Sequence, residues 1–213
     1  MVKQYTINLL NFARHLNLIF KANNFFVFML KNILFNPIKA WETIDSENKP
    51  VNVIRNRFLI PLIFLVSASA IAGSMIYKNS ELSAVYSFSV GIKCFLLFYI
   101  TTYVTAYMLK EITYPLDLGR NFAVSFRLIA YSIVPLLLCQ IISRFFESLM
   151  FINVLALFGL YIFWTGIERM LTPPSYKKLP LLIATTLTFT AAFIVTNFLF
   201  TKLIDKVFYK FFS

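Results

Sequence analysis

Three long stretches without a charged residue constrain this chain more than any other feature of its sequence. Residues 58–77 and 148–167 each give twenty residues without a charge, and residues 179–201 give twenty-three. A helix that rises about 1.5 Å per residue needs about twenty apolar residues to cross a hydrocarbon core of roughly 30 Å. The sequence therefore predicts membrane-spanning helices at these three places.

Two less uniform segments complete a predicted bundle of five spans. Residues 82–109 contain one charge, Lys93, and residues 121–143 contain Arg127 and Pro135. A charge near the end of a span can reach the interface along its aliphatic stem, and a proline kink is tolerated in lipid. We therefore expect an all-α polytopic membrane protein, with spans at 58–77, 82–109, 121–143, 148–167 and 179–201.

The composition agrees with lipid as the solvent of this chain. Hydrophobic residues make up 59% of it and charged residues only 14%, whereas an average soluble domain is roughly 45–50% apolar and about 25% charged. The net charge of +11 favours the lipid bilayer as partner, through anionic head groups on one side of the membrane, and no nucleic acid is expected.

The distribution of Lys and Arg predicts the orientation. With five spans, fourteen of the twenty basic residues fall on the side of the N-terminus, five fall on the other side, and Lys93 lies inside a span. Basic residues accumulate on the cytoplasmic side of membrane proteins. We therefore expect a cytoplasmic N-terminus and a short non-cytoplasmic tail at residues 202–213.

Residues 1–57 form a basic amphipathic segment before the first span. The piece 25–35 is apolar around Lys31 but too short to cross a membrane, and Trp41 follows it. Leu9, Phe12, Ala13, Leu16 and Phe20 share one helical face in the preceding piece. We expect helices that lie in the cytoplasmic interface; the alternative is a cytosolic helix pair that packs against the loops.

The order of these elements resembles the Yip domain family (Ypt/Rab-interacting-protein type), in particular its compact bacterial branch. The resemblance covers about residues 35–200, and its most specific part is the run Ala-Tyr-Ser-Ile-Val-Pro at residues 130–135. Ala130 stands where eukaryotic members usually have glycine, and the family's Asp-Leu-Tyr-Gly-Pro motif is absent. The resemblance implies a five-span protein of a bacterial inner (cytoplasmic) membrane, without established catalytic residues.

Four residues near the cytoplasmic side form the first candidate cluster: Arg127, Tyr131, Pro135 and Glu168. Arg127 and Tyr131 are four positions apart and share a helix face, and Pro135 leaves the carbonyl of Tyr131 without its helical donor. We expect Arg127 to form an ion pair with Glu168, or with Glu111 or Asp117 in its place. The alternatives are a solvated Glu168 and an Arg127 that only anchors the span.

A second candidate lies on the second span, where Tyr99, Tyr103 and Tyr107 follow Lys93 at a spacing of four residues. These side chains would line an intramembrane polar path, because charges inside spans often mark pathways. The alternative is a snorkelling lysine and tyrosines that pack between helices. On the first span, Ser69 and Gly73 have the spacing that permits close helix approach, either within the bundle or in a dimer.

Catalytic motifs are absent from the sequence. It contains no HExxH, no GxSxG and no phosphate-binding glycine loop; His15 is the only histidine, and Cys94 and Cys139 form no CxxC pair. We therefore expect no enzyme, no cofactor and no metal. The expected function is a non-enzymatic membrane protein that organises membrane partners or lipids, alone or as a homo-oligomer. The alternative is a small-solute or lipid transporter or channel with its path near Lys93.

Overall fold

The computed structural model describes residues 25–77 and 83–212, and this part of the chain is helical without a strand. The helices are Phe25–Phe35, α2 Pro37–Glu47, α3 Val51–Ile54, the π-helical turn η1 Arg55–Leu59, α4 Ile60–Tyr77, α5 Ser83–Thr113, α6 Phe122–Ser132, α7 Val134–Phe145, the 3₁₀ helix η2 Glu147–Leu157, α8 Phe158–Met170 and α9 Ser175–Phe212. The predicted amphipathic helix that includes Leu9 and Phe20, and the predicted connection 78–81, lie outside the described residues.

Five helical stretches of the described chain are long and apolar enough to cross a membrane. They are Val51–Ile76, Val85–Thr113, Phe122–Phe145, Leu149–Met170 and Ser175–Leu203. The predicted all-α, five-span fold is therefore confirmed.

The helices extend past the predicted ends of the spans. The first begins at residue 51 rather than 58, because Arg55 and Arg57 lie in the π-helical turn that continues into α4. Likewise, α9 runs to Phe212, through most of the predicted tail at 202–213. A charged residue marks where the apolar solvent ends, but a helix can continue beyond that point into the interface.

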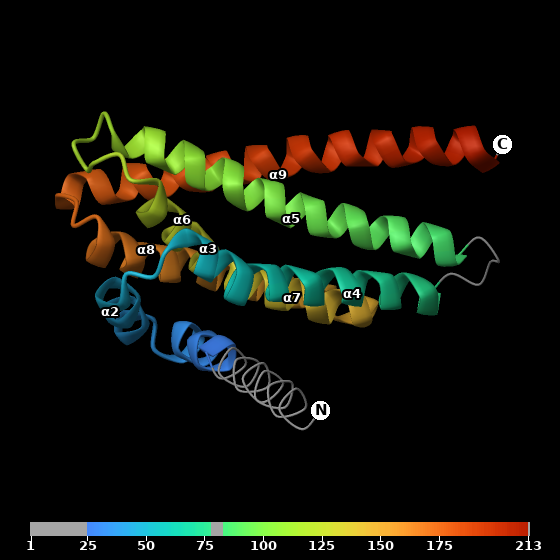
Figure 1. The fold of residues 1–213 in the computed structure, drawn as a ribbon, viewed down its shortest axis with the longest axis horizontal. Helices are drawn as coiled ribbons and strands as arrows, with labels where there is room; N and C mark the ends of the chain where they lie inside the picture. Colours follow the sequence, from blue (N-terminus) through green and yellow to red (C-terminus); the bar gives the residue numbers. More distant parts are fainter. Residues whose placement is uncertain (1–24, 78–82, 213) are drawn as a thin grey trace, which may run out of the picture.

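The long helices lie side by side, so that the bundle has two distinct ends (Figure 1). At one end are α2, the α5–α6 connection and the α8–α9 connection; we call this the α2 end. At the other are the ends of α4 and α7, the start of α5 and the C-terminal part of α9; we call this the distal end.

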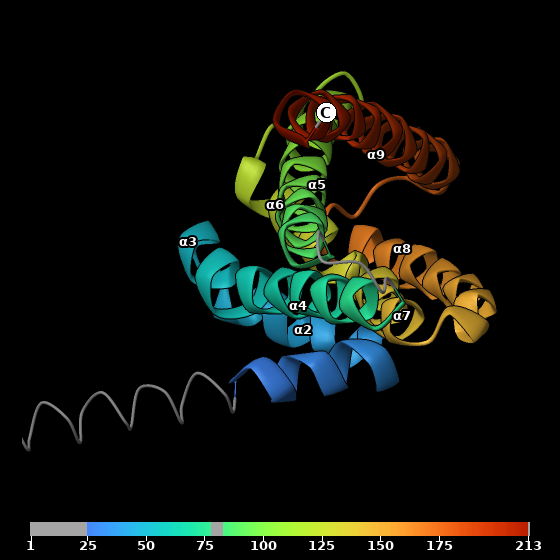
Figure 2. The same cartoon turned by 90° about the vertical axis from the view of Figure 1, so that its right-hand side faces the viewer.

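The five spans differ in how far the protein itself surrounds them. The third span, α6 with α7, is 72% buried, whereas the fifth, α9, is 17% buried. The third span contacts α4, α5 and α8, while α9 packs mainly on α5 (Figure 2). The third span therefore forms the centre of the bundle, and α9 presents most of its surface outward.

The third span is broken in its middle. α6 ends at Ser132, Ile133 takes φ −79° and ψ −5°, and α7 begins at Val134 with Pro135 in its first turn. Proline has no N–H and cannot bond the carbonyl four residues earlier, which here belongs to Tyr131. The two half-helices lie in one continuous span, as a proline-containing span permits.

α2 is fixed to the bundle close to the α8 helix. The side chain of Asn36 caps its start by accepting from the Lys39 amide at 3.4 Å, and Pro37 occupies the first turn. It ends at Glu47, and the C-cap Asn48, with its left-handed backbone (φ 41°), turns the chain back toward the first span. Asn tolerates this conformation better than most residues.

Helix Phe25–Phe35 runs across the bundle next to α2 and α4, not along it (Figure 2). Met29 and Ile33 are buried, and the ring of Phe26 lies 5.8 Å from that of Phe58. Phe28 and Phe35 are exposed. The helix thus packs on the bundle with one face and leaves an apolar face uncovered.

Candidate functional site

Arg127 is buried at the α2 end, with 5% of its surface exposed. Its Nε and Nη2 donate to the backbone carbonyl of Lys49, at 3.2 and 2.9 Å. The predicted ion pair with Glu168 is therefore wrong. The Lys49 carbonyl lies in the turn after α2, where no helical N–H donates to it. The charge-assisted hydrogen bond from Arg127 to this carbonyl compensates for the burial of the guanidinium.

The acids proposed as partners of Arg127 pair with nearer cations. Glu168 accepts from Lys178 Nζ at 2.8 Å, and Glu111 accepts from Arg120 at 2.6 Å. Asp117 lies 3.7 Å from the ammonium of Lys177. Glu111 and Asp117, predicted as alternative partners of Arg127, are therefore also wrong. Each of these acids has a basic residue of a neighbouring loop or helix end as its partner.

Tyr131 belongs to an aromatic junction, which we define as Trp41, Phe58 and Tyr131. The Tyr131 ring lies 4.8 Å from Phe58 and 6.0 Å from Trp41, edge to face with the latter. Trp41 Nε1 donates to the carbonyl of Ile162 at 2.9 Å. Edge-to-face aromatic pairs add to the stability gained by burial alone, so the junction ties α2 to the first, third and fourth spans.

Gly166 on α8 makes room for this junction. A Cβ on Gly166 would lie 2.6 Å from the indole ring of Trp41 and 2.8 Å from Leu128 Cδ2. Arg127 and Tyr131 are both buried on α6, whereas Glu168 pairs with Lys178 at the surface.

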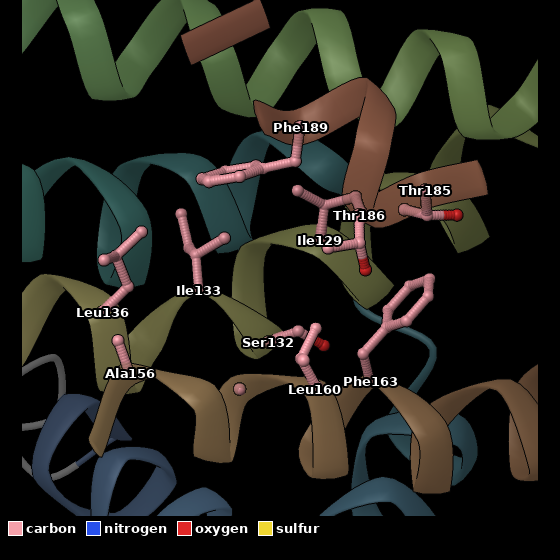
Figure 3. Close-up of a pocket in the computed structure, with 11 residues that line it drawn as sticks. Ile129, Ser132, Ile133, Leu136, Ala156, Leu160, Phe163, Thr185, Thr186 and Phe189 are labelled. Carbon is pink, nitrogen blue, oxygen red and sulfur yellow. The ribbon is translucent and has the colours of Figure 1, made fainter. Parts of the chain in front are cut away.

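Pro135 lies beside a different feature, a small apolar cavity behind the break in the third span. The cavity has a volume of about 100 Å³. Side chains from the third span, from η2 and α8, and from α9 surround it, as Figure 3 shows. Gly159 forms part of its wall, and a Cβ at this position would collide with the carbonyl of Ser132 at 2.5 Å.

The Ser132 hydroxyl beside this cavity has no hydrogen-bond partner among the described residues. An unpaired buried hydroxyl costs stability, so the cavity combines an apolar wall with one unsatisfied polar atom. No sequence signal singled out the cavity, since its lining comes from three spans whose relative placement only the fold defines.

Lys93 lies at the distal end and points into a polar cavity between α5 and α9. Its Nζ donates to Thr201 Oγ1 at 2.7 Å, and the cavity, of about 200 Å³, is also lined by Asn197 and Arg144. The sequence is compatible with either a snorkelling Lys93 or a Lys93 that lines a polar path. Its bond to a side chain on another span shows that it contributes to contact between α5 and α9.

The tyrosine stripe does not continue this cavity. Tyr99 and Tyr103 lie 4.8 Å apart, and Tyr103 packs 5.1 Å from the ring of Phe126. Tyr107 is 51% exposed, with the ammonium of Lys110 4.6 Å from its ring. The tyrosines are thus aromatic packing and surface contacts, apart from Lys93.

Arg144 was not singled out from the sequence, where it stands in a predicted outer loop. It lines the same cavity as Lys93, and its main chain lies close to α4, because a Cβ on Gly73 would overlap the Arg144 carbonyl. The small-residue spacing of Ser69 and Gly73 therefore serves a contact within the bundle.

Among residues 25–77 and 83–212, no three His, Cys, Asp or Glu side chains gather as metal ligands would. Cys94 and Cys139 are free thiols, both buried. Nothing in this part of the chain offers a built metal centre.

Comparison with known proteins assigns part of the chain to a family. A family model described as the Yip1 domain matches residues 31–203. No curated protein and no solved structure matches the chain.

Proposed function

Because the chain belongs to the Yip1 domain family, we propose that it is a non-enzymatic integral membrane protein that organises membrane partners or lipids from its α2 end. The match over residues 31–203 confirms the predicted family, and the five long apolar helices are consistent with a membrane setting. Yip1 proteins are not known as enzymes. The proposal therefore rests on the surfaces of the protein rather than on a catalytic centre.

One observation carries the proposal: the N-terminal segment is fixed to the bundle on one side and left open on the other. The bonds from Trp41 to the Ile162 carbonyl and from Arg127 to the Lys49 carbonyl hold α2 and the turn after it. The side chains that are exposed on helix Phe25–Phe35 and on the first turn of α2 form what we call the N-terminal face: Val27, Phe28, Lys31, Phe35, Ile38 and Lys39.

Apolar side chains interleaved with lysines are suited to the head-group region of a bilayer. The apolar groups enter the boundary with the acyl chains, and each lysine contributes about 1 kcal/mol near an anionic surface. The partner in this proposal is therefore the cytoplasmic leaflet, with its anionic head groups.

The proposal places the α2 end in the cytoplasm and the C-terminus outside it, in a bacterial cytoplasmic membrane. The excess of fourteen over five basic residues supports this orientation. A reporter fused after Ser213 is expected to be active only outside the cytoplasm. Activity inside the cytoplasm would contradict the orientation.

The N-terminal face can be tested in the full chain reconstituted in vesicles. An environment-sensitive fluorophore on Phe35→Cys, at a position 82% exposed, should report a less polar surrounding in anionic than in neutral vesicles. Added salt and the pair Lys31→Gln with Lys39→Gln should both reduce the difference, because they weaken attraction to the surface. Equal signals in both lipids at all salt concentrations would contradict the proposal.

Two controls match this experiment. Lys202→Gln removes an exposed lysine at the distal end and should leave the signal unchanged. The same fluorophore on Tyr176→Cys, which is 72% exposed at the α2 end but outside the N-terminal face, reports general proximity to lipid.

The alternative function, a small-solute or lipid transporter or channel, requires the polar cavity at Lys93 to continue along α5. The packing of Tyr99 and Tyr103 against aromatic neighbours supports the first function instead. A solute flux across vesicles that Lys93→Gln abolishes would favour the alternative.

A further inference from the structure

Two adjoining cavities open the distal end of the bundle. The one that contains Lys93, of about 200 Å³, shares Tyr86, Val90 and Arg144 with a larger one of about 770 Å³. We call the combined space the distal recess. It lies between α4, α5, α7, η2 and α9, opposite the α2 end on which the proposed function rests.

Lys93 enters the recess with unused hydrogen-bonding capacity. The Thr201 hydroxyl donates to the Asn197 carbonyl at 2.8 Å, so it accepts from Lys93 Nζ. An ammonium has three donors, and this contact uses one of them. Thr201 thus holds the ammonium in place between α5 and α9 without neutralising it.

Arg144 supplies a second cation from the opposite wall. Its main chain is fixed by the contact with Gly73 on α4. Within the described chain, its guanidinium has neither an ion pair nor a hydrogen bond. A guanidinium offers five donors in a planar fork that matches phosphate oxygens.

The recess therefore has two cations and, among the described residues that line it, no carboxylate. The other polar groups around it are neutral, among them Gln140, Asn153 and Asn197. Cations next to an apolar medium are costly unless an anion accompanies them. The chemistry of the recess is that of an anion site.

Its position in the bundle favours an anion that carries acyl chains. Lys93 is ten residues from the start of α5, about 15 Å at 1.5 Å per residue, and Arg144 is next to the last residue of α7. α9 forms one wall, and its outward side chains Ile194, Phe198 and Leu199 are more than half exposed. A phosphate between the cations would thus have apolar surface beside it.

We propose that the distal recess binds the phosphate group of an anionic phospholipid, with Lys93 and Arg144 as its two cationic contacts. The lipid's acyl chains run along the exposed side of α9. This site is separate from the N-terminal face and would exist whether or not that face binds the other leaflet.

The full chain in detergent can test the site by native mass spectrometry, with phosphatidylglycerol, phosphatidylcholine and inorganic phosphate as probes. Phosphatidylglycerol should bind most tightly. Lys93→Gln with Arg144→Gln should weaken it by about tenfold or more, since each charged hydrogen bond is worth more than a neutral one. Lys93→Arg keeps a cation and should retain binding, as should the control Lys110→Gln at the α2 end.

Each result decides a part of the proposal. Unchanged phosphatidylglycerol affinity in a double variant that elutes like the parent protein overturns the site. Equal binding of phosphatidylcholine overturns the preference for an anionic lipid. Displacement of the lipid by inorganic phosphate at the same concentration overturns the role of the acyl chains.

A second measurement needs no variant and so remains decisive if the double variant does not fold. An amine-reactive reagent should label Lys93 several-fold more slowly when phosphatidylglycerol is bound, and Lys110 at the α2 end at an unchanged rate. Equal labelling of Lys93 with and without the lipid overturns the proposal.

Discussion

The two ends of the bundle use the same kinds of side chain in opposite ways. At the α2 end, Arg127, Trp41 and Tyr131 are at most 5% exposed. The Trp41 indole and the Arg127 guanidinium each donate a hydrogen bond to a backbone carbonyl. At the distal end, Arg144 is exposed and lines cavities of about 200 and 770 Å³.

This difference indicates a division of roles. A buried cation that is bonded to a carbonyl is not accessible to a ligand, and it stabilises the arrangement of the helices. A cation on the wall of a cavity adds little to stability and remains available for binding. We therefore expect the α2 end to stabilise the bundle and the distal end to bind a ligand.

The largest effect is expected from Trp41→Ala. It removes a fully buried indole and its bond to Ile162, and loss of a buried aromatic costs about 3–5 kcal/mol. Denaturant unfolding in detergent micelles measures the change. Tyr176→Ala, at the same end but 72% exposed, should change stability by no more than about 0.5 kcal/mol; equal losses would remove the contrast between junction and surface.

The next effect compares the two arginines directly. Arg127→Met should cost about 1.5–3 kcal/mol, the range for hydrogen bonds to charged groups, whereas Arg144→Met should stay within about 0.5 kcal/mol. Unfolding midpoints of the two variants provide the test. If Arg144→Met is the more damaging, the distal end is not the open one.

The charge exchange Arg127→Glu with Glu168→Arg belongs to the same comparison. It should fail to recover the stability lost in Arg127→Glu, because the partner of Arg127 is the Lys49 carbonyl and that of Glu168 is Lys178. Recovery would show that the two side chains interact after all.

A smaller effect is expected where the distal end is locally close-packed. Gly73→Ala places a methyl group against the Arg144 carbonyl, and overpacking of this kind costs about 1–3 kcal/mol. Ala68→Val adds more volume on the same helix at an exposed position and serves as the control. A tolerated Gly73→Ala would mean that α4 and α7 can separate at the distal end at little cost.

The smallest effect is expected for Glu168→Gln. Its pair with Lys178 is at the surface of the α2 end, and exposed pairs contribute about 0.2–1 kcal/mol. A double-mutant cycle with Lys178→Gln, repeated at high salt, should give a coupling that salt removes. A large, salt-independent coupling would place Glu168 in the stabilising region after all.

The five spans could be predicted because lipid imposes one requirement over some twenty residues at a time. The partner of Arg127 could not, since it is a backbone carbonyl 78 positions away. That carbonyl is accessible only because Asn48 takes a left-handed conformation. A sequence shows which acidic side chains could pair with an arginine, but it does not show which backbone carbonyls are free to accept from it.

The distal recess was hidden for a related reason. Lys93 is conspicuous in the sequence because a charge inside a span is rare, whereas Arg144, near the end of its span, has the pattern of an ordinary loop residue. Their proximity depends on how α5, α7 and α9 lie relative to one another. No local pattern encodes that arrangement.

The bond between Trp41 and Ile162 also has a consequence for synthesis. The two residues are 121 positions apart, and at 5–20 residues per second the ribosome needs roughly 6 to 24 s to add the second after the first. During that interval three spans enter the membrane while α2 has no α8 to pack against. The packing of α2 is therefore completed late, and until then the surface that contacts α8 is exposed to the insertion machinery and the bilayer.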